Sequence, residues 1–241
     1  MRKHFVLGLI VLGLIVSSAS PIMAANIPIN SIDGDWANAV GGQNVYIQVD
    51  QSPNGRLSTV SWGESRALIN PDRSSYTFLS TATPFNANSN GTAFALGAFA
   101  HNNFPIPSGS GITSVQLLFN LGIAGLPALP ATFYFSHNET PNGCQGLNCS
   151  NDLVTVTPFL NAAFSYDSNG DGAAENYFFS LLGFSQDSGN TFSTQFSTIE
   201  NQVNNATLYG KITERAVPEP ATLLLMGLGL VGLAGARRFK K

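Results

Sequence analysis

The body of this chain, residues 25–216, is predicted to fold as an all-β domain, a jelly-roll-like β-sandwich with short strands. Two observations predict this class. Short runs rich in aromatic and β-branched residues alternate with clusters of Gly, Asn, Pro and Ser, which is the spacing of strands and turns. In runs such as Phe94, Leu96 and Ala98, every second side chain lies on one face, which should face a core. Patterns typical of helices are nearly absent.

The same pattern locates the individual strands, each bounded by turn-forming residues. No repeat of 20–50 residues is evident, which argues against a solenoid or a propeller. The expected strands are 44–49, 57–62, 76–79, 92–100, 114–121, 131–136, 152–157, 163–166, 176–182, 192–196 and 207–212.

The N-terminus, residues 1–24, is typical of a secretory signal peptide. A basic start, an apolar run over 5–16 and small residues before Ala24 predict export and cleavage after Ala24, with Ala25 close behind. An uncleaved signal anchor is the less favoured alternative, because the apolar run is short and Pro21 follows it. Residues 25–216 then form one extracellular domain.

The charge of the body excludes one class of partner. Residues 25–216 carry five basic and thirteen acidic side chains, a formal charge of −8 where the whole chain has −3. Phosphate binding needs clustered Lys and Arg, so we expect no nucleic-acid partner. Abundant Asn, Ser, Thr and Gln can instead hydrogen-bond sugars.

The two cysteines, Cys144 and Cys149, lie close together in the sequence, and export favours a disulfide that staples a turn. A metal site is the alternative. Structural zinc needs four ligands, and no second Cys or His pair lies near enough in sequence to supply them.

Residues 167–175 contain the pattern most typical of a binding site. Its first six residues match the start of a calcium loop, where oxygen ligands at alternate positions converge on the ion. The end departs from an EF-hand, because position twelve is Phe178 and no flanking helices are evident. A hairpin connection without an ion is the alternative, since Asn-Gly and Asp-Gly are strong turn formers. The candidate calcium ligands are Asp167, Asn169, Asp171 and Glu175.

The body offers no convincing catalytic set, so we expect no enzymatic activity. Its histidines are His101 and His137, and neither a Gly-x-Ser-x-Gly elbow nor a His-Glu-x-x-His helix is present. A lone histidine carries no mechanism without an oriented partner. We expect His101 to end a strand and to bond a loop carbonyl or an Asn side chain such as Asn103.

The C-terminal tail has three parts: a Pro-Glu-Pro motif, an apolar run and a basic end. Proline cannot continue a helix or a central strand, so the motif should be exposed to a processing enzyme. The run over 221–236 can cross hydrocarbon as a helix of about 24 Å, short for a bilayer core of about 30 Å. The basic end should stay cytoplasmic, which leaves the body on the far side. The motif is Val217, Pro218, Glu219 and Pro220, and the basic residues are Arg237, Arg238, Lys240 and Lys241.

This tail resembles the PEP-CTERM sorting signal of bacterial surface proteins over residues 217–241. The resemblance implies that exosortase, a membrane-embedded cysteine protease-like sorting enzyme, processes the protein at or near the motif. It also implies transient anchoring in the inner membrane, a final place at the cell surface or in the extracellular matrix, and a setting of exopolysaccharide production. A simple membrane anchor with an accidental Pro-Glu-Pro triplet is the alternative.

Parts of the body resemble the THxN-type and choice-of-anchor K domains found in PEP-CTERM proteins. The similar segments span most of the body, but the chain has Ala100 where the THxN motif has Thr. Those domains are defined by sequence and sorting signal rather than by an activity, so the resemblance implies only an extracellular β-domain. The segments are 61–63, 96–106, 152–154 and 177–184.

Two functions follow as hypotheses. The first is an exported structural or adhesive protein among exopolysaccharide, which should expose aromatic side chains such as Trp36 or Tyr46 along a groove. Trp36 could equally lie in the core, where we expect Trp62. The second is a secreted carbohydrate-active enzyme, because β-sandwiches host both binding and hydrolysis. An enzyme should place two carboxylates across one cleft.

Overall fold

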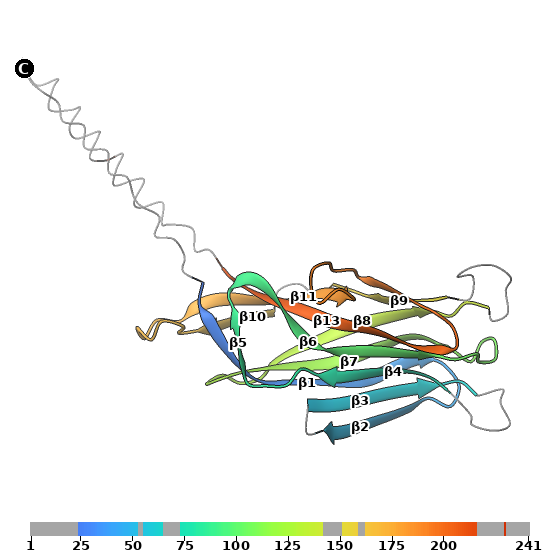
Figure 1. Cartoon of the computed structure of the whole chain (residues 1–241). Coiled ribbons are helices and arrows are strands. Elements are labelled where there is room, and N and C mark those ends of the chain that lie inside the picture. The colour runs from blue at the N-terminus through green and yellow to red at the C-terminus, as the bar shows by residue number, and fades with distance from the viewer. Residues whose placement is uncertain are drawn as a thin grey trace, which may run out of the picture.

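The computed structural model describes residues 24–52, 55–64, 73–141, 151–158 and 162–215 and the single residue Gly229. The described residues form strands that assemble into two facing, curled sheets, an elongated β-sandwich (Figure 1). The strands are β1 (Asn26–Gly41), β2 (Tyr46–Ser52), β3 (Gly55–Trp62), β4 (Ser74–Ser80), β5 (Phe85–Asn88), β6 (Asn90–Asn103), β7 (Ile112–Ile123), β8 (Leu129–Asn138), β9 (Asp152–Val156), β10 (Ala162–Tyr166), β11 (Glu175–Ser185), β12 (Gln195–Thr198) and β13 (Gln202–Glu214).

Each sheet contains segments that are distant in the sequence. One sheet has six strands in the order β12-β9-β8-β7-β1-β5, and the other has seven in the order β10-β11-β13-β6-β4-β3-β2. The pairings between these strands are antiparallel, and consecutive strands such as β7 and β8 form hairpins. The chain passes repeatedly from one sheet to the other, so each sheet is completed only by late strands such as β12 and β13.

The all-β class is confirmed, and each of the expected strands overlaps an observed one. The predicted strand 192–196 is displaced toward the N-terminus, because the observed strand β12 begins at Gln195. Two strands, β1 and β5, were not predicted. The expectation of short strands is wrong for the centre of the sandwich, where β1 has 16 residues and β6 has 14, against a usual five or six. The described residues form thirteen strands, more than the eight of a jelly roll, so the narrower jelly-roll-like class stays a prediction.

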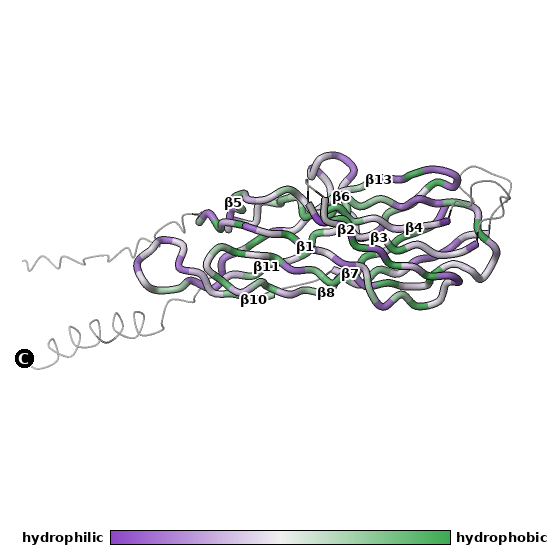
Figure 2. The backbone as a smooth tube through the Cα atoms, turned by 90° about the horizontal axis from the view of Figure 1, so that it is seen from below, coloured by the Kyte–Doolittle hydropathy of each residue, from purple (hydrophilic) through white to green (hydrophobic). Residues whose placement is uncertain are grey.

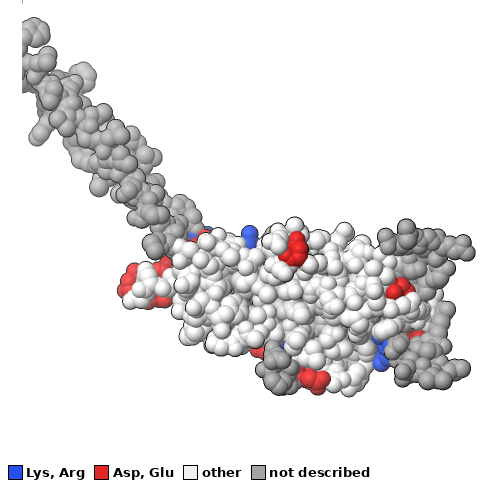
Figure 3. All heavy atoms as spheres, viewed as in Figure 1, with Lys and Arg blue, Asp and Glu red and all other residues white. Residues whose placement is uncertain are grey.

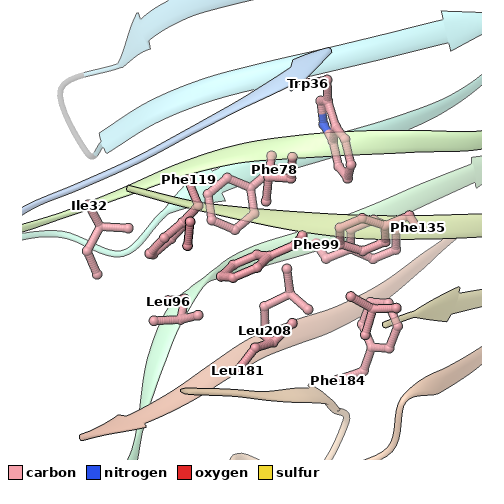
Figure 4. Packing of buried hydrophobic residues seen from close by; sticks show 14 of the residues in the cluster. Ile32, Trp36, Phe78, Leu96, Phe99, Phe119, Phe135, Leu181, Phe184 and Leu208 are labelled. Carbon is pink, nitrogen blue, oxygen red and sulfur yellow. The ribbon is translucent and has the colours of Figure 1, made fainter. Parts of the chain in front are cut away.

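The core lies between the sheets and is filled by aromatic rings (Figure 4). Along β8, the side chains of Ala131, Phe133 and Phe135 are buried while their neighbours lie toward solvent, as the two-residue period of a strand requires. Figure 2 shows hydrophobic and hydrophilic residues alternating along the strands of the elongated body. Trp36 and Trp62 are both buried, so the core interpretation holds for both and the binding-platform interpretation of Trp36 is wrong.

The inward-facing rows change character at one end of the sandwich. On β6, Phe99 is followed two residues later by His101, and on β8, Phe135 is followed two residues later by His137. Both histidines keep the inward register and are buried. The hydrophobic core therefore ends in a buried polar layer to which both sheets contribute.

Candidate functional site

The predicted calcium ligands lie in the loop between β10 and β11, which projects from the end of the sandwich at the left of Figure 1. Asp167, Asp171 and Glu175 each offer a carboxylate oxygen, and these atoms lie within 4.8 Å of one another. The structure thus brings together the three carboxylates that the sequence pattern singled out.

Hydrogen bonds within this loop already satisfy most of those oxygens. The carboxylate of Asp167 accepts bonds from the backbone N–H of Gly170 at 2.7 Å and of Gly172 at 2.9 Å. Glu175 accepts from both the backbone N–H and the hydroxyl of Ser168. The loop is therefore a self-contained hairpin connection, as the alternative interpretation expected.

Asn169 takes a different orientation from that of a calcium ligand. Its side-chain NH₂ donates to Asp171 at 3.1 Å and to Glu175 at 3.0 Å, so it lies where a cation would bridge the two carboxylates. Its side-chain oxygen accepts from the backbone N–H of Asp171. Calcium binding requires this amide to turn, so calcium stays a prediction.

If calcium binds, 1 mM Ca²⁺ should raise the melting temperature relative to chelator. Extracellular calcium modules have dissociation constants of about 0.1–1 mM, which gives a rise of about 1–5 °C for a domain of this size. In Asp171→Ala the rise should vanish, because a ligand is gone. Melting curves followed by circular dichroism measure both.

Asp187→Ala is the matched control for this experiment. The carboxylate of Asp187 holds another exposed loop by accepting from the backbone N–H groups of Asn190 and Thr191 and from the hydroxyl of Thr191. The hydrogen bonds from Thr191 lower the pKa of Asp187 to about 2. Its removal should lower the melting temperature but leave the calcium response intact. If the melting temperature of wild type is the same with calcium and with chelator, the loop is not a calcium site.

A second group of polar side chains, which the sequence did not predict, lies in the buried layer at the opposite end. His101, His137 and Asp152 are all buried, and a ligand atom from each lies within 4.8 Å of the others. His101 comes from the seven-stranded sheet, whereas the other two come from β8 and β9 of the six-stranded sheet. The group therefore bridges the two sheets.

His101 is held by Thr198, not by Asn103 or a loop carbonyl as expected. Its Nδ1 lies 2.8 Å from the hydroxyl oxygen of Thr198, and that hydroxyl donates to the backbone carbonyl of Asp152. If the hydroxyl proton is used there, at 3.4 Å, the Thr198 oxygen accepts from Nδ1–H of His101. The other ring nitrogen, Nε2, is buried and has no hydrogen-bond partner among the described residues. Asn103 donates to Thr198 as well.

His137 has partners at both ring nitrogens. Its Nδ1 lies 2.5 Å from the hydroxyl of Tyr76, and its Nε2 lies 3.1 Å from Glu139 Oε2 and 3.8 Å from Asp152 Oδ2. The other oxygen of Asp152 accepts from the backbone N–H of Thr140, whereas Oδ2 is buried without a hydrogen-bond partner in the part of the chain that the structure describes.

Burial dominates the electrostatics of this end. It lowers the pKa of His101 well below its ordinary value, which His137 reinforces, and it raises the pKa of Asp152 to about 6. The pKa of Glu200 is raised to about 7 by burial and then by the nearby Asp152 and Glu139. The pKa of Tyr76 is raised well above its ordinary value, again mainly by burial. Burial thus withdraws the imidazole of His101 and the carboxyl groups of Asp152 and Glu200 from water.

A pocket of about 390 Å³ opens beside the buried group. It is lined by His137 and Glu139 together with Gly111, Thr113 and Ile106 from the neighbouring turn and strand. The pocket connects solvent to Glu139, whose side chain is 18% exposed. The pocket thus ends at Glu139, beyond which the side chains of His137 and Asp152 are fully buried.

Sequence reasoning missed this group because its members lie between positions 101 and 152, on three different strands, and match no spacing motif. The available signal was the register of the strands. His101 follows Phe99, and His137 follows Phe135, by two residues, which places polar side chains in an otherwise apolar inward row.

Several predicted features fall outside the described residues. They are the signal peptide, both cysteines with their expected disulfide, the sorting motif Val217–Pro220, the apolar run and the basic end. Within the described residues, no helix is long and apolar enough to cross a membrane.

Comparison with known proteins gives one finding. The family model described as the PEP-CTERM protein-sorting motif matches residues 216–238. The chain thus carries this motif, as expected, and the motif implies export, transient membrane anchoring before sorting and a processing partner of the exosortase type. No curated protein matches the chain.

Proposed function

We propose that this PEP-CTERM protein is a non-enzymatic structural or adhesive β-domain that acts at the bacterial cell surface or in an exopolysaccharide matrix. The sorting motif at residues 216–238 is the observation that carries the proposal, because it implies export and removal of the tail. The body that remains is a sandwich whose core is packed with aromatic rings. Such a body suits a durable extracellular component.

The surface favours adhesion through uncharged and aromatic side chains over adhesion through charged groups. On the face shown in Figure 3, few of the described side chains are charged. The exposed aromatic side chains include Tyr46 on β2, 59% exposed, and Tyr134 on β8, 54% exposed. Exposed aromatic rings provide flat apolar area with a polar tip, a combination common at binding surfaces. Tyr46 therefore keeps the platform role that Trp36 loses.

Strand β2 adds a second adhesive feature. It ends the order of the seven-stranded sheet, and Tyr46, Ile47 and Val49 on it are exposed. An edge strand with apolar side chains can pair with another strand or collect apolar ligands.

Sorting is tested by the mass and location of the protein in cells with and without the sorting enzyme. We expect a shorter, released form in wild-type cells and an intact, membrane-bound form without the enzyme. Glu219→Ala should reproduce the intact form, whereas Glu214→Ala, just before the motif, should be processed normally. An identical mass and location in both strains contradicts the sorting proposal.

Adhesion is tested by retention of the mature protein on exopolysaccharide from its own cells. Tyr46→Ala and Tyr134→Ala should each reduce retention severalfold, because each removes an exposed ring. Val203→Ala, which changes another exposed apolar residue, should not. Retention equal in all four proteins, or none in wild type, contradicts the adhesive proposal.

One observation favours the alternative of a carbohydrate-active enzyme. The pocket is lined by His137 and Glu139. The pKa values of two nearby carboxyl groups, those of Asp152 and Glu200, are raised, an arrangement also found in hydrolases. Release of sugars from exopolysaccharide by wild type but not by Glu139→Gln would select this alternative. No release by either protein supports the non-enzymatic proposal.

A further inference from the structure

The strongest unexplained feature of the molecule is a set of buried polar atoms on residues that lie together between the sheets. Nε2 of His101 and Oδ2 of Asp152 lack hydrogen-bond partners within the described residues, and the side chains of Asp152 and His137 are fully buried. A buried polar atom without a partner is costly to the folded state, so natural proteins normally satisfy it. Two such atoms beside a third ligand atom indicate a shared partner.

The charge of the group identifies the kind of partner. The carboxylates of Glu139 and Asp152 lie 3.1 Å and 3.8 Å from the same atom, Nε2 of His137, so two acidic side chains share one imidazole. Among the described residues, His137 is the only basic side chain that lies within ion-pair distance of these carboxylates, and no Lys or Arg does. A divalent cation supplies the missing positive charge.

We propose that His101, His137 and Asp152 bind a zinc ion that joins the two sheets, with Glu139 as the fourth ligand. Two imidazoles and carboxylate oxygens suit zinc, whereas calcium and magnesium prefer oxygen ligands alone. The proposed set is closed by protein side chains, which is the arrangement of a structural rather than a catalytic zinc site. This site is independent of the adhesive role.

Three of the proposed ligands need only small adjustments to accept the ion, and Glu139, which already contacts His137, must turn toward it. A tetrahedral zinc with bonds of about 2.0–2.1 Å places its ligand atoms about 3.3 Å apart. His137 Nε2 already lies 3.8 Å from Asp152 Oδ2 and 3.1 Å from Glu139 Oε2, and the widest separation among the three buried residues is at most 4.8 Å. The rings of His101 and His137 are 5.3 Å apart and nearly perpendicular, so they do not block each other.

Outer contacts orient both rings as metal ligands require. In the tautomer whose Nδ1–H donates to Thr198, the lone pair of His101 Nε2 is left unused and can bind a metal. Tyr76 contacts Nδ1 of His137 and leaves Nε2 on the side of the carboxylates. In the metal-free tautomer whose Nε2–H donates to Glu139, zinc takes the place of that proton at Nε2. The proton moves to Nδ1, and the resulting Nδ1–H donates to the Tyr76 oxygen.

The test uses the intact chain, purified in detergent from cells that lack the sorting enzyme. We expect about one zinc per chain by elemental analysis, and a visible absorption band of tetrahedral cobalt when Co²⁺ replaces zinc. In His137→Gln and Asp152→Asn, zinc affinity should fall more than about 100-fold, beyond the 10–100-fold effect of losing an outer contact. Thr198→Val should show that smaller effect.

Asp171→Ala is the matched control, because it removes a carboxylate from the exposed loop at the far end of the sandwich. That end lies about 30 Å from the buried group, judged from the length of β13 between its partners on β6 and β11. The control should bind zinc like wild type. Zinc retained in His137→Gln but lost in Asp171→Ala places the ion in the loop and overturns the proposal.

Wild type alone provides a second test, which does not depend on variants that could fail to fold. At 100-fold excess over its dissociation constant, zinc should raise the melting temperature of the stripped protein by about 5–10 °C. A protein that shows no cobalt band and no change in melting temperature with zinc also overturns the proposal.

Discussion

Phe99→Ala should lower the free energy of unfolding by about 3–5 kcal/mol, the usual range for removing a fully buried phenylalanine. Phe99 is completely buried at the centre of the sandwich (Figure 4). Its ring stacks on Phe135 with centroids 5.8 Å apart and also packs against Tyr76 and Phe184 at 5.2 Å. These rings come from both sheets, so the resulting cavity cannot collapse by the movement of one strand.

Urea unfolding followed by circular dichroism measures this effect. Tyr134→Ala is the matched control, since it truncates an aromatic residue on the surface and should change the free energy of unfolding by about 0.5 kcal/mol or less. Equal losses in the two variants would mean that the centre of the core is not where the structure places it.

Gly34→Ala should lower the free energy of unfolding by about 1–3 kcal/mol through overpacking. A Cβ atom at Gly34 on β1 would lie 2.6 Å from Cε1 of Phe78 on the opposite sheet. The ring has little room to retreat, because it already packs close to the backbone of Gly97, where an added Cβ would lie 2.5 Å from Cζ of Phe78. Phe78 thus fills a slot that exists only because both neighbours are glycine.

A double-mutant cycle isolates this contact. In the Phe78→Leu background the ring is absent, so the same Gly34→Ala change should be less destabilising by about 0.5–3 kcal/mol. Strictly additive losses would show that Gly34 matters for some reason other than its approach to Phe78.

Gly34 also explains why β1 escaped prediction although it is the longest strand. With Pro28, Gly34 and several Asn and Asp residues, its sequence is typical of turns. The tertiary structure overrides this local preference, because β1 pairs with β5 and β7 and packs across Phe78. Strands such as β8 were predictable because their apolar alternation is complete within a few residues.

The two candidate sites also differ in how predictable they are from the sequence, because their residues are either contiguous or far apart in the chain. The Asp167–Glu175 loop is contiguous in sequence, so its carboxylates necessarily meet once the chain turns. Together with its partners Tyr76 and Thr198, the buried group combines residues from β4, β6, β8, β9 and β12, and each of these is an ordinary strand residue in its own segment. Only the pairing of Tyr76 with His101 and the facing of the two sheets bring them together.

The sequence by itself determined the sorting signal of this protein and its class of fold. The PEP-CTERM motif is a linear pattern, and alternation of apolar side chains is a local property of strands, so both can be read without a structure. Only the tertiary structure decided which residues meet between the sheets, because strand order and register depend on contacts between segments far apart in the chain. For that reason His101 and His137, isolated in the sequence, lie together with Asp152 in the folded protein.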